Sequence, residues 1–443
     1  MTEDGTSLEI AGERIGASGT ELHEKIRRGV GQISAELIED RRRFHALAEL
    51  GWRERRTSAE IVDRLAALGF SVSSGKEFLK DAPLLGVDPA AERPQTGCAA
   101  ELDSGRPGPT VCIRVDIDAL PISEAPAPHR PSAEGWASAA AGVMHACGHD
   151  GHVAIGLGIA RILAPLVRKQ GAGRLRLLFQ PAEEGVRGGR ALLDAGWVRD
   201  VDLLIGFHIG FGVPAGTVAV GVRGFLATEK LRVRLTGRAA HAGKEPERGR
   251  NALLGACQIA LGLHALAQSS APGLRVNVGR LEAGRAMNVV ADEAELLVEL
   301  RAERSDDLRE LSGRARRLIE GIAHAGELGR SIDVIGEAAE WCNPAPLAHW
   351  AAEIARRSGA FERVLEDHVF GASEDATLLA RSVAARGGQA GYFLLGAALK
   401  ADHHTPEFDF DEEVLPRGVL LLAAMIAAPL LRADRGDEGS GSG

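Results

Sequence analysis

A short segment of the chain concentrates side chains that bind metal ions. Residues Met144–His152 read MHACGHDGH, which places three histidines, one cysteine and one aspartate among glycines. Thiolate and imidazole groups are the usual ligands of zinc and similar ions, and glycines let the backbone bend so that neighbouring donors converge. A polar loop that caps a helix, with Cys147 simply buried, is the alternative. The density of donors favours a metal site.

A pair of acidic residues supplies a second part of the chemistry. Gln180–Gly185 (QPAEEG) directly follows a predicted strand, and α/β sheets place their sites at the carboxyl ends of strands. Neighbouring side chains in extended backbone point in opposite directions, so Glu184 can bind a metal while Glu183 faces the attacking water as a general base. A bound metal lowers the pKa of water toward about 7, within reach of such a base. Taken alone, the pair also fits a solvated acidic turn.

Further donors lie far apart in the sequence. His208 ends a predicted strand, and His403-His404 precede an acidic and aromatic stretch. Asp116 and Asp118, at the end of another strand, can orient ligand imidazoles from behind. One sulfur, three nitrogens and one carboxylate from four separate loops suffice for two metal ions that share a water: Cys147, His149, Glu184, His208 and His404.

Strands that alternate with helices must bring these donors together, which predicts an α/β layer structure with a parallel or mixed sheet. The stretch 72–109, rich in proline and glycine, is expected to be an irregular surface excursion. Strands are expected at 110–117, 174–179, 202–207 and 389–395, and helices at 22–50, 57–68, 152–167, 346–358 and 412–431.

The pattern changes after about Phe225. The predicted order is then strand 229–237, helix 251–266, strands 274–281 and 294–301, helix 305–323 and strand 331–337, a β-α-β-β-α-β ferredoxin-like arrangement. A chain of 443 residues is also too long for one hydrophobic core. We therefore predict a discontinuous catalytic metal-binding domain (21–224 plus 338–432), an inserted α+β domain (225–337), and flexible tails (1–20 and 433–443).

Composition excludes several classes of protein. The net charge of −9 argues against nucleic acid or an anionic membrane as the main partner. Five widely spaced cysteines do not form a disulfide framework. No signal-type segment and no run of 18 apolar residues is present. These features together predict a cytoplasmic protein that acts on a small molecule.

The ordered motifs resemble the aminoacylase and carboxypeptidase-G type of metallopeptidase. Within it, the Cys-Gly-His-Asp-Gly-His segment is similar to the amidohydrolase branch, and several stretches are similar to its p-aminobenzoyl-glutamate hydrolases. The resemblance runs from about Ile33 to Leu431. It is carried by Asp116–Pro121, Gly135–Ser138, Met144–His152, Gln180–Gly185, His208, Gly212–Val218, Gly237–Gly243, Ser373–Leu378 and His404–Glu412.

The resemblance implies two divalent metal ions, manganese or alternatively zinc. The ligands would be the five donors named above, with Glu183 as the general base. Asp118 and Asp150 would support the ligands from behind. The residue before the last ligand is usually apolar but here is His403, so either His403 or His404 is open as that ligand.

The resemblance also assigns roles to the inserted domain, as a lid and dimerisation domain. His241, which from its own sequence could equally be a surface residue, would reach a neighbouring subunit's site and stabilise the oxyanion. Asn288 and Arg301 would help hold the substrate carboxylate, which an arginine pairs in bidentate fashion, and Arg285 is expected to lie near the substrate. The residues Arg285-Ala286-Met287 stand where a glycine-rich turn is more usual. The partner is either a second copy of the chain or a homologous subunit.

The expected reaction is hydrolysis of an amide between an aromatic or other acyl group and an amino acid, as in p-aminobenzoyl-glutamate. One alternative is hydrolytic deamination of an activated aromatic amine at the same metals. Another is an inactive partner subunit, which the intact Glu183 and complete ligand set oppose. A structural zinc protein would have closed four-ligand sites, and five donors with a spare acid do not fit it.

Overall fold

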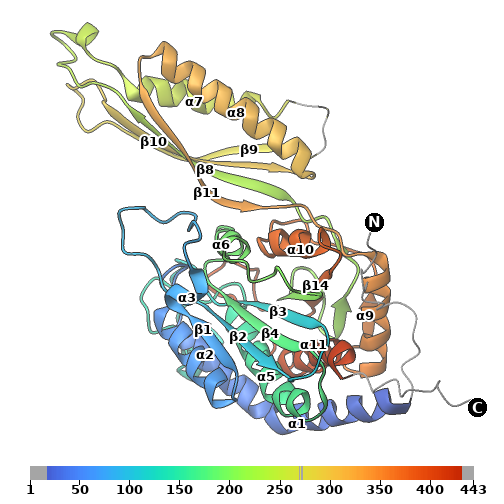
Figure 1. The fold of residues 1–443 in the computed structure, drawn as a ribbon. Coiled ribbons are helices and arrows are strands. Elements are labelled where there is room, and N and C mark those ends of the chain that lie inside the picture. The colour runs from blue at the N-terminus through green and yellow to red at the C-terminus, as the bar shows by residue number, and fades with distance from the viewer. Residues whose placement is uncertain (1–16, 269, 271–272, 432–443) are drawn as a thin grey trace, which may run out of the picture.

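The computed structural model describes residues 17–268, 270 and 273–431. Figure 1 shows a large layered unit and a smaller unit that projects from it. Of the predicted tails, 1–16 and 433–443 lie outside the described residues, whereas 17–20 form the first turn of helix α1 (Ala17–Ala46).

An eight-stranded mixed sheet forms the centre of the large unit. Its four middle strands β4, β3, β5 and β14 run parallel, and β1 and β2 continue the sheet antiparallel at one edge. The predicted α/β class is confirmed. In sheet order the strands are β1 (Ser71–Ser74), β2 (Cys98–Asp103), β4 (Arg174–Gln180), β3 (Thr110–Asp116), β5 (Leu203–Ile209), β14 (Gln389–Leu395), β6 (Thr217–Ala219) and β12 (Arg363–Leu365).

Helices cover both faces of this sheet, which explains why every residue of β3 and β5 is buried. Helices α1, α5 (His149–Gln170) and α11 (Val414–Leu430) pack together on one face, and α6 (Gly188–Ala195) and α10 (Ala376–Ala384) on the other (Figure 1). Helices α2 (Arg55–Ala67) and α9 (Ala345–Ser358) join the first group. Short elements complete the unit: α3 (Gly75–Leu79), α4 (Arg130–Glu134), β7 (Val222–Arg223) and β13 (His368–Val369).

The smaller unit, residues 227–338, is called the insert below. It is an antiparallel sheet of order β11-β8-β10-β9 with two helices on one face and its own apolar core. Its chain leaves and rejoins the large unit beside α10 and α6, where Glu337 N donates to Val186 O (2.8 Å). Its elements are β8 (Ala227–Thr236), η1 (Pro246–Arg248), α7 (Ala252–Ala265), β9 (Arg275–Ala283), β10 (Glu293–Ala302), α8 (Ser305–Ala325) and β11 (Gly329–Ala338).

Two local predictions were wrong. The stretch 72–109 is not wholly irregular, since it contains β2, which pairs with β4 and is almost fully buried. Its sequence CAAELD lacks the β-branched residues that indicate a strand. Helix α5 begins at His149 rather than at residue 152, because Gly148 adopts a left-handed φ of 93° at its start.

Helix α5 is the one described helix long and apolar enough to cross a membrane. Within its most apolar window, 83% of the residues are buried inside the protein. It packs against α1, α11 and the central sheet. Its apolar surface is therefore that of a core helix.

Candidate metal centre

The carboxyl ends of the parallel strands meet at one edge of the large sheet. Asp116 ends β3, Gln180 ends β4, and His208 is the penultimate residue of β5. The first turn of α5 starts at His149 and reaches the same edge. The sheet thus gathers side chains from four separate segments, as the strand order of an α/β protein dictates.

All five predicted metal-binding residues lie together at this edge. Cys147, His149 and His208 form one group of donor atoms, and Cys147, Glu184 and His404 form a second, each within 4.8 Å of one another. The Cys147 sulfur is 3.5 Å from His208 Nε2, and His404 Nε2 is 3.3 Å from Glu184 Oε1. The two groups share Cys147, so they describe two adjoining positions.

Buried atoms without partners test whether these groups fit metal ions. His149 Nε2 and Glu184 Oε1 are buried and make no hydrogen bond to any described residue. Such orphaned atoms are costly unless something else satisfies them. Burial and the nearby Glu184 raise the pKa of the Cys147 thiol, whereas a bound cation would favour its thiolate. The donors therefore fit a pair of divalent cations.

Asp118 fixes the positions of three functional residues at once. Its two carboxylate oxygens accept hydrogen bonds from the backbone N–H groups of Glu183 and Glu184, each at 3.0 Å. Its backbone oxygen accepts from His149 Nδ1 at 2.9 Å. That bond assigns the proton to Nδ1 and leaves Nε2 as the donor atom for a metal.

His152 lies against the site but has no free nitrogen for a metal. Its Nδ1 donates to Asp116 Oδ1, and its Nε2 accepts from the backbone N–H of Ile209 at 3.1 Å. Asp116 Oδ2 in turn accepts from Arg114 Nη1 at 2.6 Å. His152 therefore supports the strand ends rather than offering a lone pair to an ion.

Asp150 joins the site to helix α1. Its Oδ2 accepts from Arg41 Nε (3.0 Å) and His45 Nδ1 (2.8 Å), and it contacts no candidate ligand atom. Arg41 also donates to Asp409 Oδ1 at 2.7 Å. This buried arginine links the start of α5 to the segment that follows His404.

Glu183 lies beside the first donor group. It is 9% exposed, and its Oε2 is 4.0 Å from His149 Nε2. Burial, then the carboxylates of Glu374 and Glu184, raise its pKa. A carboxylate with a raised pKa can take a proton from water and return it to a leaving group.

The backbone that presents Glu183 and Glu184 differs from the expected extended conformation. The two residues form a turn, in which Val186 N donates to Glu183 O at 2.6 Å. Ala182 before them has a left-handed φ of 52°. The turn is held by Asp118, and it leaves one oxygen of each carboxylate within 4.8 Å of the other and of a His149 nitrogen.

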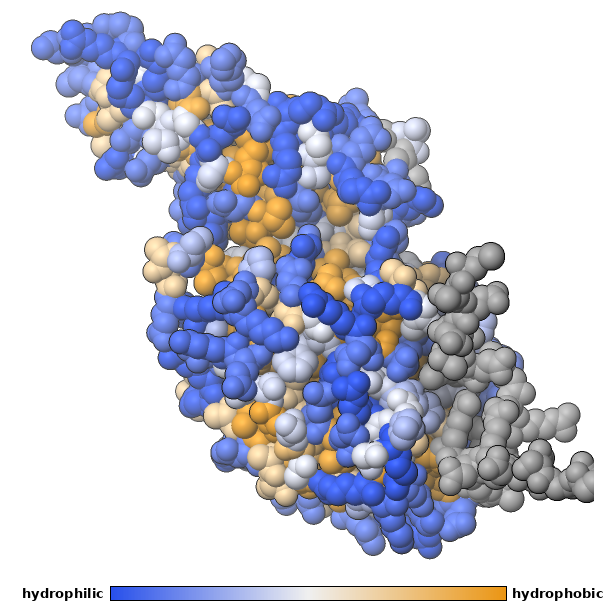
Figure 2. Space-filling model, viewed as in Figure 1, coloured by the Kyte–Doolittle hydropathy of each residue, from blue (hydrophilic) through white to orange (hydrophobic). Residues whose placement is uncertain are grey.

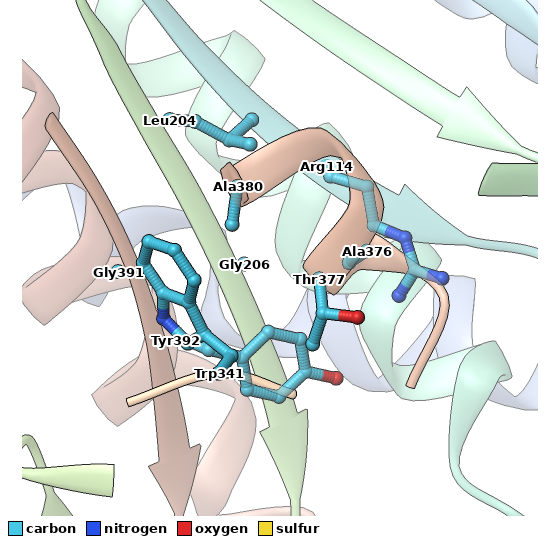
Figure 3. A pocket seen from close by; sticks show the side chains of 9 residues that line it. All are labelled: Arg114, Leu204, Gly206, Trp341, Ala376, Thr377, Ala380, Gly391 and Tyr392. Carbon is cyan, nitrogen blue, oxygen red and sulfur yellow. The ribbon is translucent and has the colours of Figure 1, made fainter. Parts of the chain in front are cut away.

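Sequence reasoning gave no role to Glu374 and Asp375, which lie within 4.8 Å of Glu183. Arg114 Nη2 is 3.0 Å from Glu374 and 2.9 Å from Asp375. Figure 3 shows Arg114 and Tyr392 around a cavity of about 10 Å³, which has room for about one water molecule. The cavity is too small for a substrate. The only signal for these acids was the SEDATL stretch at Ser373–Leu378.

The structure distinguishes the two adjacent histidines. His404, with a left-handed φ of 64°, belongs to the second donor group. His403 belongs to neither group. Its Nε2 donates to Ile209 O at 3.1 Å, and burial lowers its pKa to about 4. The geometry therefore favours His404 as the last ligand.

The four predicted residues of the insert lie apart from the donor groups. His241 forms an isolated β-bridge with Val289, and Ala242 N donates to Asn288 O at 3.1 Å, so His241 and Asn288 share one exposed region. Arg285 pairs with Asp292 (2.7 Å), and Arg301 pairs with Glu299 (2.9 Å).

A mixed α/β domain that gathers sulfur, imidazole and carboxylate donors around a buried acid defines the class of metal-dependent hydrolases. Residues 112–428 match the model of Peptidase family M20/M25/M40, and the chain belongs to this family. Members of the family use two metal ions. The predicted family and the predicted metal-dependent amide hydrolysis are confirmed.

Named relatives cover almost the whole chain. It is 43% identical to one of the subunits of p-aminobenzoyl-glutamate hydrolase from Escherichia coli, over 90% of this chain and 97% of that one. It is 42% identical to indole-3-acetyl-aspartic acid hydrolase of Enterobacter agglomerans, over 91% and 97%. The crystal structure of an aminobenzoyl-glutamate utilization protein from Klebsiella pneumoniae aligns with a TM-score of 0.76 at 36% identity, over 91% and 98%.

Proposed function

We propose that this chain hydrolyses the amide bond between an aromatic acyl group and an acidic amino acid, as in p-aminobenzoyl-glutamate. Both relatives above are named for substrates in which an aromatic acyl group is linked to glutamate or aspartate. The observation that carries the proposal is the pair of donor groups that share Cys147, with the buried acid Glu183 beside them.

Five residues would hold the metal ions: Cys147, His149, Glu184, His208 and His404. Manganese is the proposed metal and zinc the alternative, because thiolate favours zinc while imidazole and carboxylate also suit manganese. When bound, the two ions would make water acidic and polarise the substrate carbonyl.

Glu183 is the proposed general base. Its carboxylate accepts a proton from the attacking water and then delivers that proton to the nitrogen of the departing amino acid. Asp118 holds the backbone of Glu183, which fixes the point from which its side chain extends. Asp150, tied to Arg41, would hold the first turn of α5 from behind.

We also propose that the insert, predicted at 225–337 and described at 227–338, is a ferredoxin-like lid and dimerisation domain. Its sheet order β11-β8-β10-β9 supports this assignment, and β9 is an unpaired edge strand. On the neighbouring α7, Leu254 and Leu261 are 56% and 76% exposed. Figure 2 shows hydrophobic patches on the insert among hydrophilic residues. Such exposed apolar surface fits an interface with a second copy or a homologous subunit.

In that assembly the insert would complete the site. His241 would stabilise the oxyanion in the neighbouring subunit's site, Asn288 and Arg301 would hold the substrate carboxylate, and Arg285 would lie near the substrate. The exposed position of His241 and Asn288 supports this role, because an exposed side chain can reach a neighbouring subunit. We propose the cytoplasm as the compartment, since all five cysteines are free thiols.

The test is a product assay on the metal-loaded protein. The chain, alone or mixed with a homologous partner chain, is incubated with p-aminobenzoyl-glutamate, indole-3-acetyl-aspartate and N-acetyl-glutamate. The proposal predicts release of the free amino acid, fastest from the aromatic conjugates. Ammonia and a hydroxylated ring would instead indicate deamination. No turnover in any mixture, with both metals bound, would contradict the proposal.

A further inference from the structure

A row of aromatic rings extends outward from the candidate metal centre. The ring of Phe211 lies 4.5 Å from that of His208, edge to face, and 4.5 Å from that of His403, nearly parallel. It also lies 4.6 Å from the ring of Phe370. The His403 and Phe370 rings are inclined by 27° and 38° to the Phe211 ring and pack against it. Phe211 nevertheless remains partly exposed.

The backbone is bent in order to hold Phe211 in this position. Gly210, Phe211 and Gly212 have φ values of 89°, 49° and 74°, three left-handed residues in succession. Glycine adopts this conformation freely, but a residue with a large side chain does so rarely, and such positions gather at functional sites. A Cβ on Gly210 would lie 2.7 Å from His403 Cε1, so the glycine also admits the His403 ring.

His403 brings one polar atom to this row. Its Nε2 donates to the backbone oxygen of Ile209 at 3.1 Å, so Nε2 carries the proton of the neutral ring. Nδ1 is then a hydrogen-bond acceptor, and among the described residues the ring bonds only through Nε2. A ligand with an N–H group can use this acceptor.

We propose that Phe211 and His403 form the binding surface for the aromatic acyl group of the substrate, with Nδ1 of His403 accepting a hydrogen bond from an aryl amine. This inference rests on the proposed function and names the residues that select its acyl group. The surface adjoins His208, one of the candidate metal-binding residues. A partly exposed aromatic ring favours contact with another aromatic group over an alkyl group.

The test compares three glutamate conjugates that differ only in the acyl group: p-aminobenzoyl, benzoyl and acetyl. In F211L, the ratio of kcat/KM for benzoyl-glutamate to that for acetyl-glutamate should fall about tenfold. F225L is the matched control, because Phe225 stacks on Phe370 in the same cluster but is only 1% exposed. It should leave that ratio unchanged. H403F keeps a ring but loses Nδ1, so it should lower the preference for p-aminobenzoyl over benzoyl about fivefold.

Metal content and thermal unfolding are measured for every variant, so that damage to the metal centre is recognised. Equal losses on all three substrates in F211L, or an equal change of ratio in F225L, would overturn the inference. If the wild-type protein cleaves none of the conjugates, the proposed function fails. In that case the binding of p-aminobenzoate to the wild-type protein and to F211L is measured by calorimetry. Loss of binding in F211L supports the inference, and retained binding contradicts it.

Discussion

Replacing Asp118 by asparagine tests how the site is held. Asparagine keeps the shape of the side chain but turns one acceptor oxygen into an NH₂ group. The aspartate oxygens accept from the backbone N–H groups of Glu183 and Glu184, both at 3.0 Å. D118N therefore loses one of these two bonds and leaves a buried N–H group unpaired. A hydrogen bond to a charged group contributes about 1.5–3 kcal/mol.

If this lost free energy had stabilised the transition state, kcat/KM should drop about 10- to 150-fold, because about 1.4 kcal/mol corresponds to a factor of ten. The contact between the Asp118 backbone oxygen and His149 is unchanged by the substitution, so the group of Cys147, His149 and His208 should keep its ion. The assay is turnover of p-aminobenzoyl-glutamate together with metal analysis of the same samples. A kcat/KM within threefold of wild type, at full metal content, would refute the positioning role of Asp118.

Three further predictions address the metals, the buried acid and the interface. C147S should lower the affinity for both ions, because both donor groups contain Cys147. H404A should instead leave about one ion per chain after dialysis. Equal metal loss in C147S and H404A would contradict the sharing of the Cys147 sulfur. Burial and Asp118 raise the pKa of Glu54 to about 8 from 4.5, so the unfolding free energy of the metal-free protein should fall as pH rises between these values. E54Q should make that slope shallower in urea titrations, and an unchanged slope would exclude Glu54 as a contributor. L261R should convert a dimer to a monomer in light scattering and slow turnover, and an unchanged mass would argue against an α7 interface.

The residues of the two donor groups could be predicted from sequence because their chemistry is local and distinctive. Cysteine and histidine one residue apart, between glycines, have few other uses, and the adjacent glutamates follow a recognisable strand. Asp118 was predicted as a supporting residue from its place after a strand. Its actual contacts, with the backbone of Glu183 and Glu184, depend on a turn that the sequence does not specify.

The contacts of Glu374 and Asp375 could not be predicted in the same way. They reach Glu183 only after α10 packs across the sheet from more than 180 residues away in the chain. A buried arginine, Arg114, pairs with both of them, and an arginine inside a predicted strand gives no signal of that role. Strand β2 was missed because neighbouring strands, rather than its own residues, determine its burial.

The substitution E183Q, with metal content and turnover measured on one preparation, tests the central claim most directly. Glutamine keeps the size of the side chain but cannot take a proton from water. We predict that E183Q binds as much metal as the wild-type protein and that kcat for p-aminobenzoyl-glutamate falls at least about 10²- to 10⁴-fold. Turnover close to that of the wild-type protein, at equal metal content, would contradict the assignment of Glu183 as the general base.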